Sequence, residues 1–319
     1  MVDLRKEQQV INMVEWIERP FILGAEDVFY LVMMAFFVAL PCSQLGAFLV
    51  LRRMSLVGDA ISHSVLPGIV VAFLFTEDLS SPWLLVGASG AGLLVTFMIE
   101  MIHSKTRVKQ DAAIGIAFTS LFAIGVILVS VYASKVHIDA DCVVYGKLVS
   151  ILDHDSVTML GYDVPKPLVT SAIVAILTML TVIVCYRILL LSSFDPGMAA
   201  SIGYRPRIVH YALMAVLSMV VVTSFQAVGA ILVIALLIIP AASAYLCSHR
   251  LKVMLLLSGV HALISSVMGL YLYVWMDCSF AAAMVVAGSI LFLFAWFFGP
   301  ADGIIIKAFH RRSISLGND

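Results

Sequence analysis

Long apolar runs separated by short polar segments dominate this sequence. A transmembrane helix needs about 20 mainly apolar residues. Nine stretches meet that requirement: 28–51, 56–75, 83–102, 112–132, 168–191, 208–226, 227–247, 253–275 and 280–298. Almost nothing polar separates the sixth stretch from the seventh, so these two form a tight or partly re-entrant hairpin. The pattern predicts an all-α polytopic membrane protein with about nine transmembrane helices, or eight if that hairpin does not cross fully.

Composition supports a membrane-embedded chain. Of the 319 residues, 62% are hydrophobic and only 12% are charged, whereas about 25% of an ordinary globular protein is charged. The five cysteines show no paired spacing, which argues against a metal-thiolate site. The N-terminal segment is polar and lacks the apolar core of a cleavable signal peptide. We therefore expect no soluble catalytic domain and no role for nucleic acid.

Basic residues orient the predicted spans. Cytoplasmic loops of membrane proteins carry an excess of Lys and Arg. With the N-terminus outside, the inner segments hold 13 of the 19 basic residues and the outer segments hold the other six. This distribution predicts an N-out, C-in chain. It divides into an extracytoplasmic segment over 1–27, a transmembrane domain over 28–298 and a cytoplasmic tail over 299–319.

Asp59 and His63 form the strongest candidate site. They are four residues apart, so they share one face of a helix. Carboxylate and imidazole both bind first-row divalent metals, and an ionisable residue at membrane depth is by default a functional hypothesis. At a rise of about 1.5 Å per residue, the pair lies about 10 and 15 Å from Arg53, near mid-membrane. The alternative is a buried pair that only ties helices together.

Other candidate ligands are weaker. His261 lies inside the eighth span, where it faces a polar path through the bundle or, in the reading we favour, bonds a neighbouring backbone. His137, Asp139 and Asp141 lie in the outer segment 133–167, with the spacing of ordinary solvated residues. A metal-loading role for them at the outer mouth is the alternative.

The inner loop 192–207 carries a short-helix signature. Asp195 followed by proline is typical of a helix start, and Gly203 is typical of a helix end. The residues predicted to dock a cytoplasmic partner are Asp195, Met198, Ala199, Ala200 and Gly203. The alternative is a connector without a partner. The chain has no GxxxxGK[ST] phosphate-binding loop, so any use of ATP requires a separate subunit, and we expect no enzymatic activity of its own.

Three segments carry a family resemblance: RRMSLVGDAISHSVLPGIVVAF (52–73), FDPGMAASIGY (194–204) and VGAILVIALLIIPAASA (228–244). Together they resemble the permease subunit of zinc, manganese and iron-type ABC importers. The resemblance implies that 194–204 is the coupling helix seated on the ATPase, and that Asp59 and His63 line the translocation path. Family members usually carry an acid at the position of Gly197, and glycine cannot form a salt bridge there. Asp195 is the nearest substitute.

The resulting prediction is a permease subunit that moves divalent manganese, zinc or iron across a bacterial plasma membrane. The implied partners are a cytoplasmic ATP-binding subunit, an extracytoplasmic metal-binding protein, a second permease chain and membrane lipid. No permanently bound cofactor is expected. One alternative is an ion-coupled secondary metal transporter acting without an ATPase. A structural membrane protein without transport is the third reading.

Overall fold

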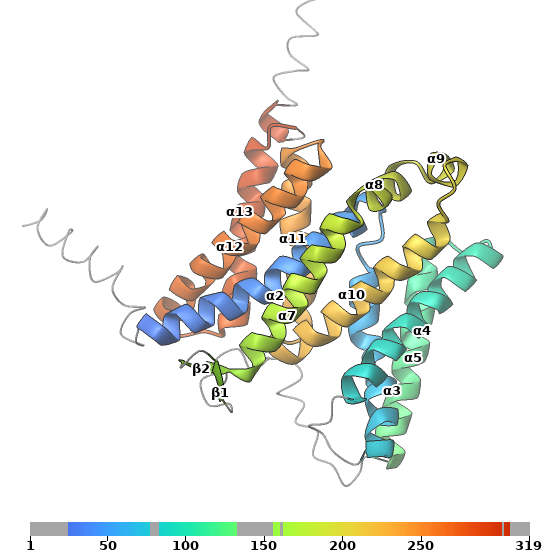
Figure 1. The fold of residues 1–319 in the computed structure, drawn as a ribbon, viewed down its shortest axis with the longest axis horizontal. Helices are drawn as coiled ribbons and strands as arrows, with labels where there is room; N and C mark the ends of the chain where they lie inside the picture. Colours follow the sequence, from blue (N-terminus) through green and yellow to red (C-terminus); the bar gives the residue numbers. More distant parts are fainter. Residues whose placement is uncertain (1–24, 77–82, 133–155, 160–161, 302, 307–319) are drawn as a thin grey trace, which may run out of the picture.

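The computed structural model describes residues 25–76, 83–132, 156–159, 162–301 and 303–306. Most of these residues are helical (Figure 1). The helices are α2 (Ala25–Leu51), α3 (Val57–Thr76), α4 (Trp83–Lys105), α5 (Gln110–Tyr132), α7 (Lys166–Val184), α8 (Tyr186–Phe194), α9 (Pro196–Ser201), α10 (Pro206–Val228), α11 (Ala230–Cys247), α12 (Leu251–Met276) and α13 (Phe280–Phe298). A chain in lipid must bond its own backbone groups, and a helix does so within one segment.

Eight helices of the described chain are long and apolar enough to cross a membrane. They are α2, α3, α4, α5, α7, α10, α12 and α13. The polytopic all-α prediction is thus confirmed. The predicted count of nine is not confirmed, because the described apolar part of α11, Leu232–Cys247, is shorter than the others.

The spans form two groups of neighbouring helices. In the first, α3 packs against α4 and α5, and α10 packs along α4. In the second, α2 packs against α11 and α12, and α13 covers α11 and α12. Figure 1 shows the first group at the right and the second at the left and centre. Helix α2 is the most buried of the eight spans, and fully buried Met34 and Phe48 place it at the core.

The tight hairpin predicted around 226–227 is present, and its connection is a single residue long. Gly229 alone joins α10 to α11. Its φ of 83° and ψ of 163° lie in a region that is essentially restricted to glycine. The missing Cβ therefore permits this one-residue junction between the two helix groups.

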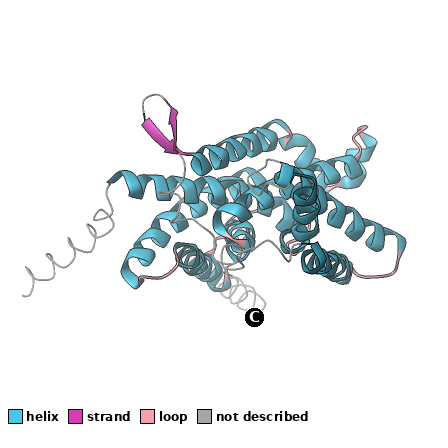
Figure 2. Ribbon diagram, turned by 90° about the horizontal axis from the view of Figure 1, so that it is seen from below, coloured by secondary structure: helices cyan, strands magenta, loops and turns pink. Residues whose placement is uncertain are grey.

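Two features of the chain were not predicted. The span expected over 168–191 breaks at Cys185, where α7 ends and the separate helix α8 begins. In addition, β1 (Ser156–Met159) pairs antiparallel with β2 (Tyr162–Pro165) inside the expected outer segment. Figure 2 shows this small hairpin standing at the edge of the helical body.

The ends of the elements lie on two sides of the bundle. Figure 1 shows the start of α2 and the strands toward the lower side, and α8, α9 and the end of α13 toward the upper side. The segment predicted to dock a cytoplasmic partner therefore lies on the same side as the end of the last span. This arrangement agrees with the predicted N-out, C-in topology, in which the upper side faces the cytoplasm.

Candidate functional site

The predicted pair of ligands is assembled on α3. His63 Nε2 lies 3.2 Å from Asp59 Oδ1. The two residues are one helical turn apart, which places their side chains next to each other on one face. Ser62, on a different face, donates its hydroxyl to the carbonyl of Gly58 at 3.0 Å and is buried. The shared face predicted for Asp59 and His63 is confirmed.

The depth estimate for the pair assumed a continuous helix from Arg53, and the structure does not contain that helix. Arg53 has a left-handed φ of 58°, and the amide of Met54 donates back to the carbonyl of Leu49 at 2.9 Å. These contacts end α2, so α3 begins only at Val57. Asp59 and His63 consequently lie in the first two turns of α3. Figure 1 shows the connection descending from the upper end of α2 to the start of α3.

Helix α5 forms an aromatic wall beside His63. The imidazole lies 6.0 Å, between ring centroids, from each of Phe118 and Phe122. Further along, Gly125 backs directly onto Pro67, and an added Cβ would lie 2.8 Å from the proline Cδ. Glycine at this position lets α5 approach α3 closely. The aromatic rings cover one side of the imidazole and restrict its orientation.

The other side of the pair is open. The side chains of Asp59 and His63 are 34% and 44% exposed, on a helix that has no other ionisable side chain. A carboxylate facing lipid hydrocarbon is costly, and such groups in membrane proteins face a water-filled cavity or another protein surface. The exposed face of α3 is therefore suited to a polar path or to contact with a second chain.

The weaker candidate ligands do not join this pair. His261 is buried on α12, where its Cε1 would lie 3.5 Å from a Cβ added at Gly288 of α13. Within the described residues, no group of three or more His, Cys, Asp or Glu side chains is close enough to hold a metal ion. His137, Asp139 and Asp141 lie outside the described residues.

The short helix predicted in the inner loop is α9. Asp195 Oδ1 accepts a hydrogen bond from the amide of Met198 at 2.8 Å and so caps the helix start. Gly203 has a φ of 98°, and the amide of Tyr204 returns to the carbonyl of Ala199 at 3.0 Å. The start and the end thus follow the predicted pattern. Since Asp195 already serves as the cap, it is a limited substitute for the acid that family members carry at Gly197.

Exposure separates the residues predicted to dock a partner. Met198 is 52% exposed and Ala200 is also exposed, but Ala199 is only 1% exposed. Ala199 therefore belongs to the packing of α9 against its own chain, and its inclusion among the docking residues was wrong. Ile202, at 56% exposure, extends the exposed apolar surface instead.

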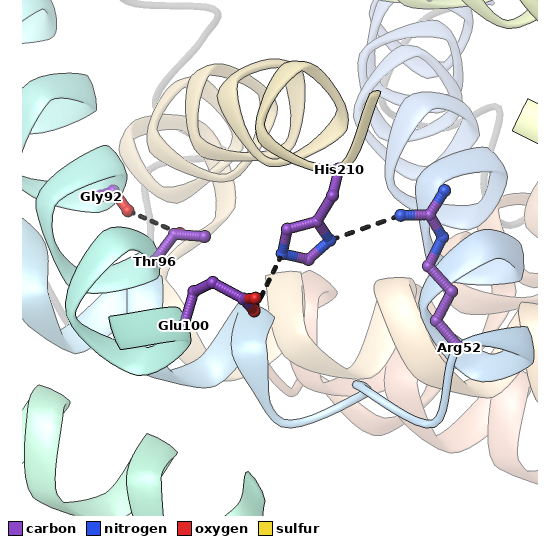
Figure 3. Close-up of polar contacts among 5 residues, drawn as sticks. All are labelled: Arg52, Gly92, Thr96, Glu100 and His210. Atoms are coloured by element: carbon purple, nitrogen blue, oxygen red, sulfur yellow. Dashed lines mark hydrogen bonds and ion pairs between the residues drawn. The ribbon is translucent and has the colours of Figure 1, made fainter. Parts of the chain in front are cut away.

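A polar cluster that was not predicted from the sequence lies near the side of the bundle that holds α9. His210 of α10 stands between Arg52 and Glu100 of α4 (Figure 3). His210 Nδ1 is 3.4 Å from Arg52 Nη1, and His210 Nε2 is 3.9 Å from Glu100 Oε2. Burial lowers the pKa of the Arg52 guanidinium, which nevertheless stays charged. These residues are far apart in the sequence, so no local spacing links them.

Comparison with known proteins places the chain in a family. The model of the ABC 3 transport family matches residues 26–299. The manganese transport system membrane protein MntD of Bacillus subtilis is 43% identical over 271 residues, which cover 85% of this chain and 91% of that protein. The zinc transport system membrane protein TroD of Treponema pallidum is 39% identical over 288 residues, which cover 90% of this chain and 78% of that protein.

Solved structures agree with this assignment. A chain in the structure of PsaBC from Streptococcus pneumoniae in complex with Fab superposes with a TM-score of 0.73 at 31% identity, covering 91% of this chain and 97% of that one. An inward-facing putative metal-chelate type ABC transporter, at 15% identity and a TM-score of 0.58, supports the fold alone. The match favours an ABC permease over an autonomous ion-coupled carrier. The chain belongs to the ABC 3 transport family, as a multi-pass permease subunit of the bacterial plasma membrane.

Proposed function

We propose that this permease carries divalent manganese or zinc into the cell, and that Asp59 and His63 contact the ion on its way. The observation that carries the proposal is their 3.2 Å pairing on the open face of α3. Oxygen and nitrogen ligands suit both metals. Manganese and zinc stand in the names of the relatives described above. Iron remains a prediction from ligand chemistry.

Two ligands from one chain do not complete a metal site. Divalent zinc takes about four ligands, and manganese in sites of this kind takes about six. A second permease chain packed across the open face of α3 would add another carboxylate and another imidazole. The 34% and 44% exposure of the pair leaves room for such a contact.

Two further partners follow from an ABC import mechanism. A cytoplasmic ATPase would supply the energy and dock on α9, with contacts from Met198, Ala200 and Ile202. An extracytoplasmic metal-binding protein would deliver the ion to the outer face. Glu77, Asp78, Asp139 and Asp141 make the outer segments acidic, and complementary charge raises association rate and specificity. The alternative is that free metal enters directly, without a binding protein, attracted by the same acids.

Uptake by proteoliposomes that contain the permease and its ATPase tests the metal contacts. Asp59→Asn and His63→Gln preserve side-chain size while they weaken metal binding. We expect each to reduce uptake by at least about tenfold, since even second-layer changes at metal sites cost 10–100-fold. Ser62→Ala, on the same helix but on a buried face, is the matched control. Uptake at the wild-type rate in both ligand variants would exclude the pair as essential contacts.

The same vesicles test delivery. Metal uptake should depend on an added extracytoplasmic binding protein when free metal is dilute. Full uptake in the absence of that protein would refute the delivery hypothesis. If ATP also proved dispensable, the proposed ABC mechanism would fail as well.

A further inference from the structure

Three charged or polar side chains meet near the cytoplasmic ends of α2, α4 and α10. Glu100 lies five residues before the end of α4, and His210 lies in the second turn of α10. Their side chains are 33% and 15% exposed. Ionisable groups inside a transmembrane bundle are costly, and they usually serve a function. The cluster of Arg52, His210 and Glu100 therefore requires an explanation beyond helix packing.

Hydrogen-bonding chemistry assigns the proton on His210. A guanidinium only donates hydrogen bonds, so the contact from Arg52 Nη1 at 3.4 Å requires a lone pair on His210 Nδ1. A neutral imidazole then carries its proton on Nε2. That nitrogen faces Glu100 Oε2 at 3.9 Å, beyond hydrogen-bonding distance, and it has no hydrogen-bond partner within the described chain. The contact with Arg52 is thus a hydrogen bond, whereas the contact with Glu100 is longer, at 3.9 Å; Figure 3 draws both as dashed lines.

This proton placement argues against a second metal site. A metal ion bound at Nε2 needs a lone pair on that nitrogen, so the proton of the neutral imidazole would have to be on Nδ1. A protonated Nδ1 could no longer accept the hydrogen bond from Arg52 Nη1. The positive charge of Arg52 would also repel a divalent cation. The cluster is therefore suited to coupling the positions of the helices, and not to binding the transported ion.

Arg52 connects the cluster to the proposed docking helix. Its Nη2 donates to Ser192 Oγ at 2.7 Å, and its Nε donates to Ser193 Oγ at 3.0 Å. Both serines belong to the end of α8, directly before Phe194 and the cap residue Asp195 of α9. A displacement of α9 would therefore reach the guanidinium through only a few residues.

Glu100 connects the cluster to the helix that carries the metal pair. Helix α4 packs along α3. The carbonyl of Gly87 in α4 occupies the space that a Cβ at Gly68 of α3 would need, and the carbonyl of Gly68 does the same to Gly87. Such close packing leaves the two helices little freedom to slide independently. A shift of α4 would therefore be transmitted to α3, and with it to Asp59 and His63.

We propose that Arg52, His210 and Glu100 form a positioning relay between the docking helix α9 and the metal-contact helix α3. Movement of α9 shifts Arg52 through its hydrogen bonds to Ser192 and Ser193, and Arg52 in turn shifts His210. The His210 Nε2–H then closes on Glu100 and draws α4 toward α10. The relay rests on the proposed function, because it requires ATPase docking at α9 and metal contact at α3. None of its three residues is proposed to touch the ion.

The test measures metal ions transported per ATP hydrolysed in proteoliposomes. Glu100→Gln keeps the shape and an acceptor oxygen but removes the charge that would strengthen the bond from His210 Nε2–H. Arg52→Lys keeps the charge but loses the planar fork. We expect each to lower the transport ratio by about fivefold or more, the lower end of the range for coupling between sites. Manganese binding to the complex and assembly with the ATPase should stay unchanged. His103→Gln is the matched control, since His103 is exposed and its hydrogen bond, to the Val108 carbonyl at 3.3 Å, stays within five residues of the chain.

A double variant separates a relay from independent packing effects. If the residues act in one chain, Arg52→Lys combined with Glu100→Gln should be little worse than either single change. Additive losses, or full coupling in the single variants, would overturn the relay. If Arg52→Lys failed to assemble, Glu100→Gln, which changes no packing volume, would still decide. Absence of ATP-dependent uptake by the wild-type complex would instead refute the proposed function.

Discussion

Gly46 of α2 lies directly against the main-chain carbonyl of Leu237 in α11, with no space for a methyl group between them. Gly46→Ala should therefore force the core helix α2 away from α11. Overpacking of this kind costs about 1–3 kcal/mol. Thermal unfolding of the purified permease in detergent measures the effect. Gly90→Ala on α4, where a Cβ meets nothing within 4 Å, should leave the melting temperature unchanged or slightly higher. Equal stability of the two variants would contradict the packing.

The cap at Asp195 should matter for docking rather than for the stability of the fold. Removing the acceptor in Asp195→Ala leaves the amide of Met198 without its partner and costs the short helix about 0.5–2 kcal/mol. The affinity for the ATPase should fall while the melting temperature barely changes. Asp195→Asn retains an acceptor oxygen and should bind almost normally. If Asn weakened binding as much as Ala, charge rather than capping would be the property that matters.

Two neighbouring positions on α9 should respond differently to a new charge. Met198→Glu places a carboxylate on an exposed surface, so the permease should fold normally but lose its ATPase. Ala199→Glu buries a charge at a position that is 1% exposed, which is strongly destabilising. Co-purification with the ATPase and unfolding temperature together distinguish the outcomes. Normal ATPase binding by Met198→Glu would remove that face of α9 from the interface.

The topology can be tested by cysteine labelling in intact cells. Glu7→Cys and Asn318→Cys are introduced separately into a variant that lacks the five native cysteines. An impermeant thiol reagent should label position 7 and spare position 318, because 13 of the 19 basic residues fall on the predicted inner side. The reverse pattern would invert the chain and place α9 outside the cell.

Local sequence patterns identified the features that depend on neighbours in the chain. Asp59 and His63 meet because helical spacing alone brings them together, and the residue types at Asp195 and Gly203 fix the two ends of α9. The break at Cys185 carries neither proline nor glycine, so the apolar run through it looks continuous. The burial of Ala199 depends on α8 and α10, which pack against α9.

Long-range contacts were out of reach for the same reason. Arg52 and His210 are 158 residues apart, and each alone resembles an ordinary residue at the membrane edge. Only the packing of α4 beside α10 makes them a cluster with Glu100. Side-chain types at these positions carry no signal of that packing.

The one-residue junction at Gly229 also bears on how the protein is made. A connection this short exposes no polar segment on the outer side at which one helix could pause while the next is synthesised. We therefore expect helices α10 and α11 to enter the bilayer together, as a single hairpin, during biogenesis. The same shortness leaves no loop there for an epitope tag or a protease, so probes of the outer surface have to be placed elsewhere.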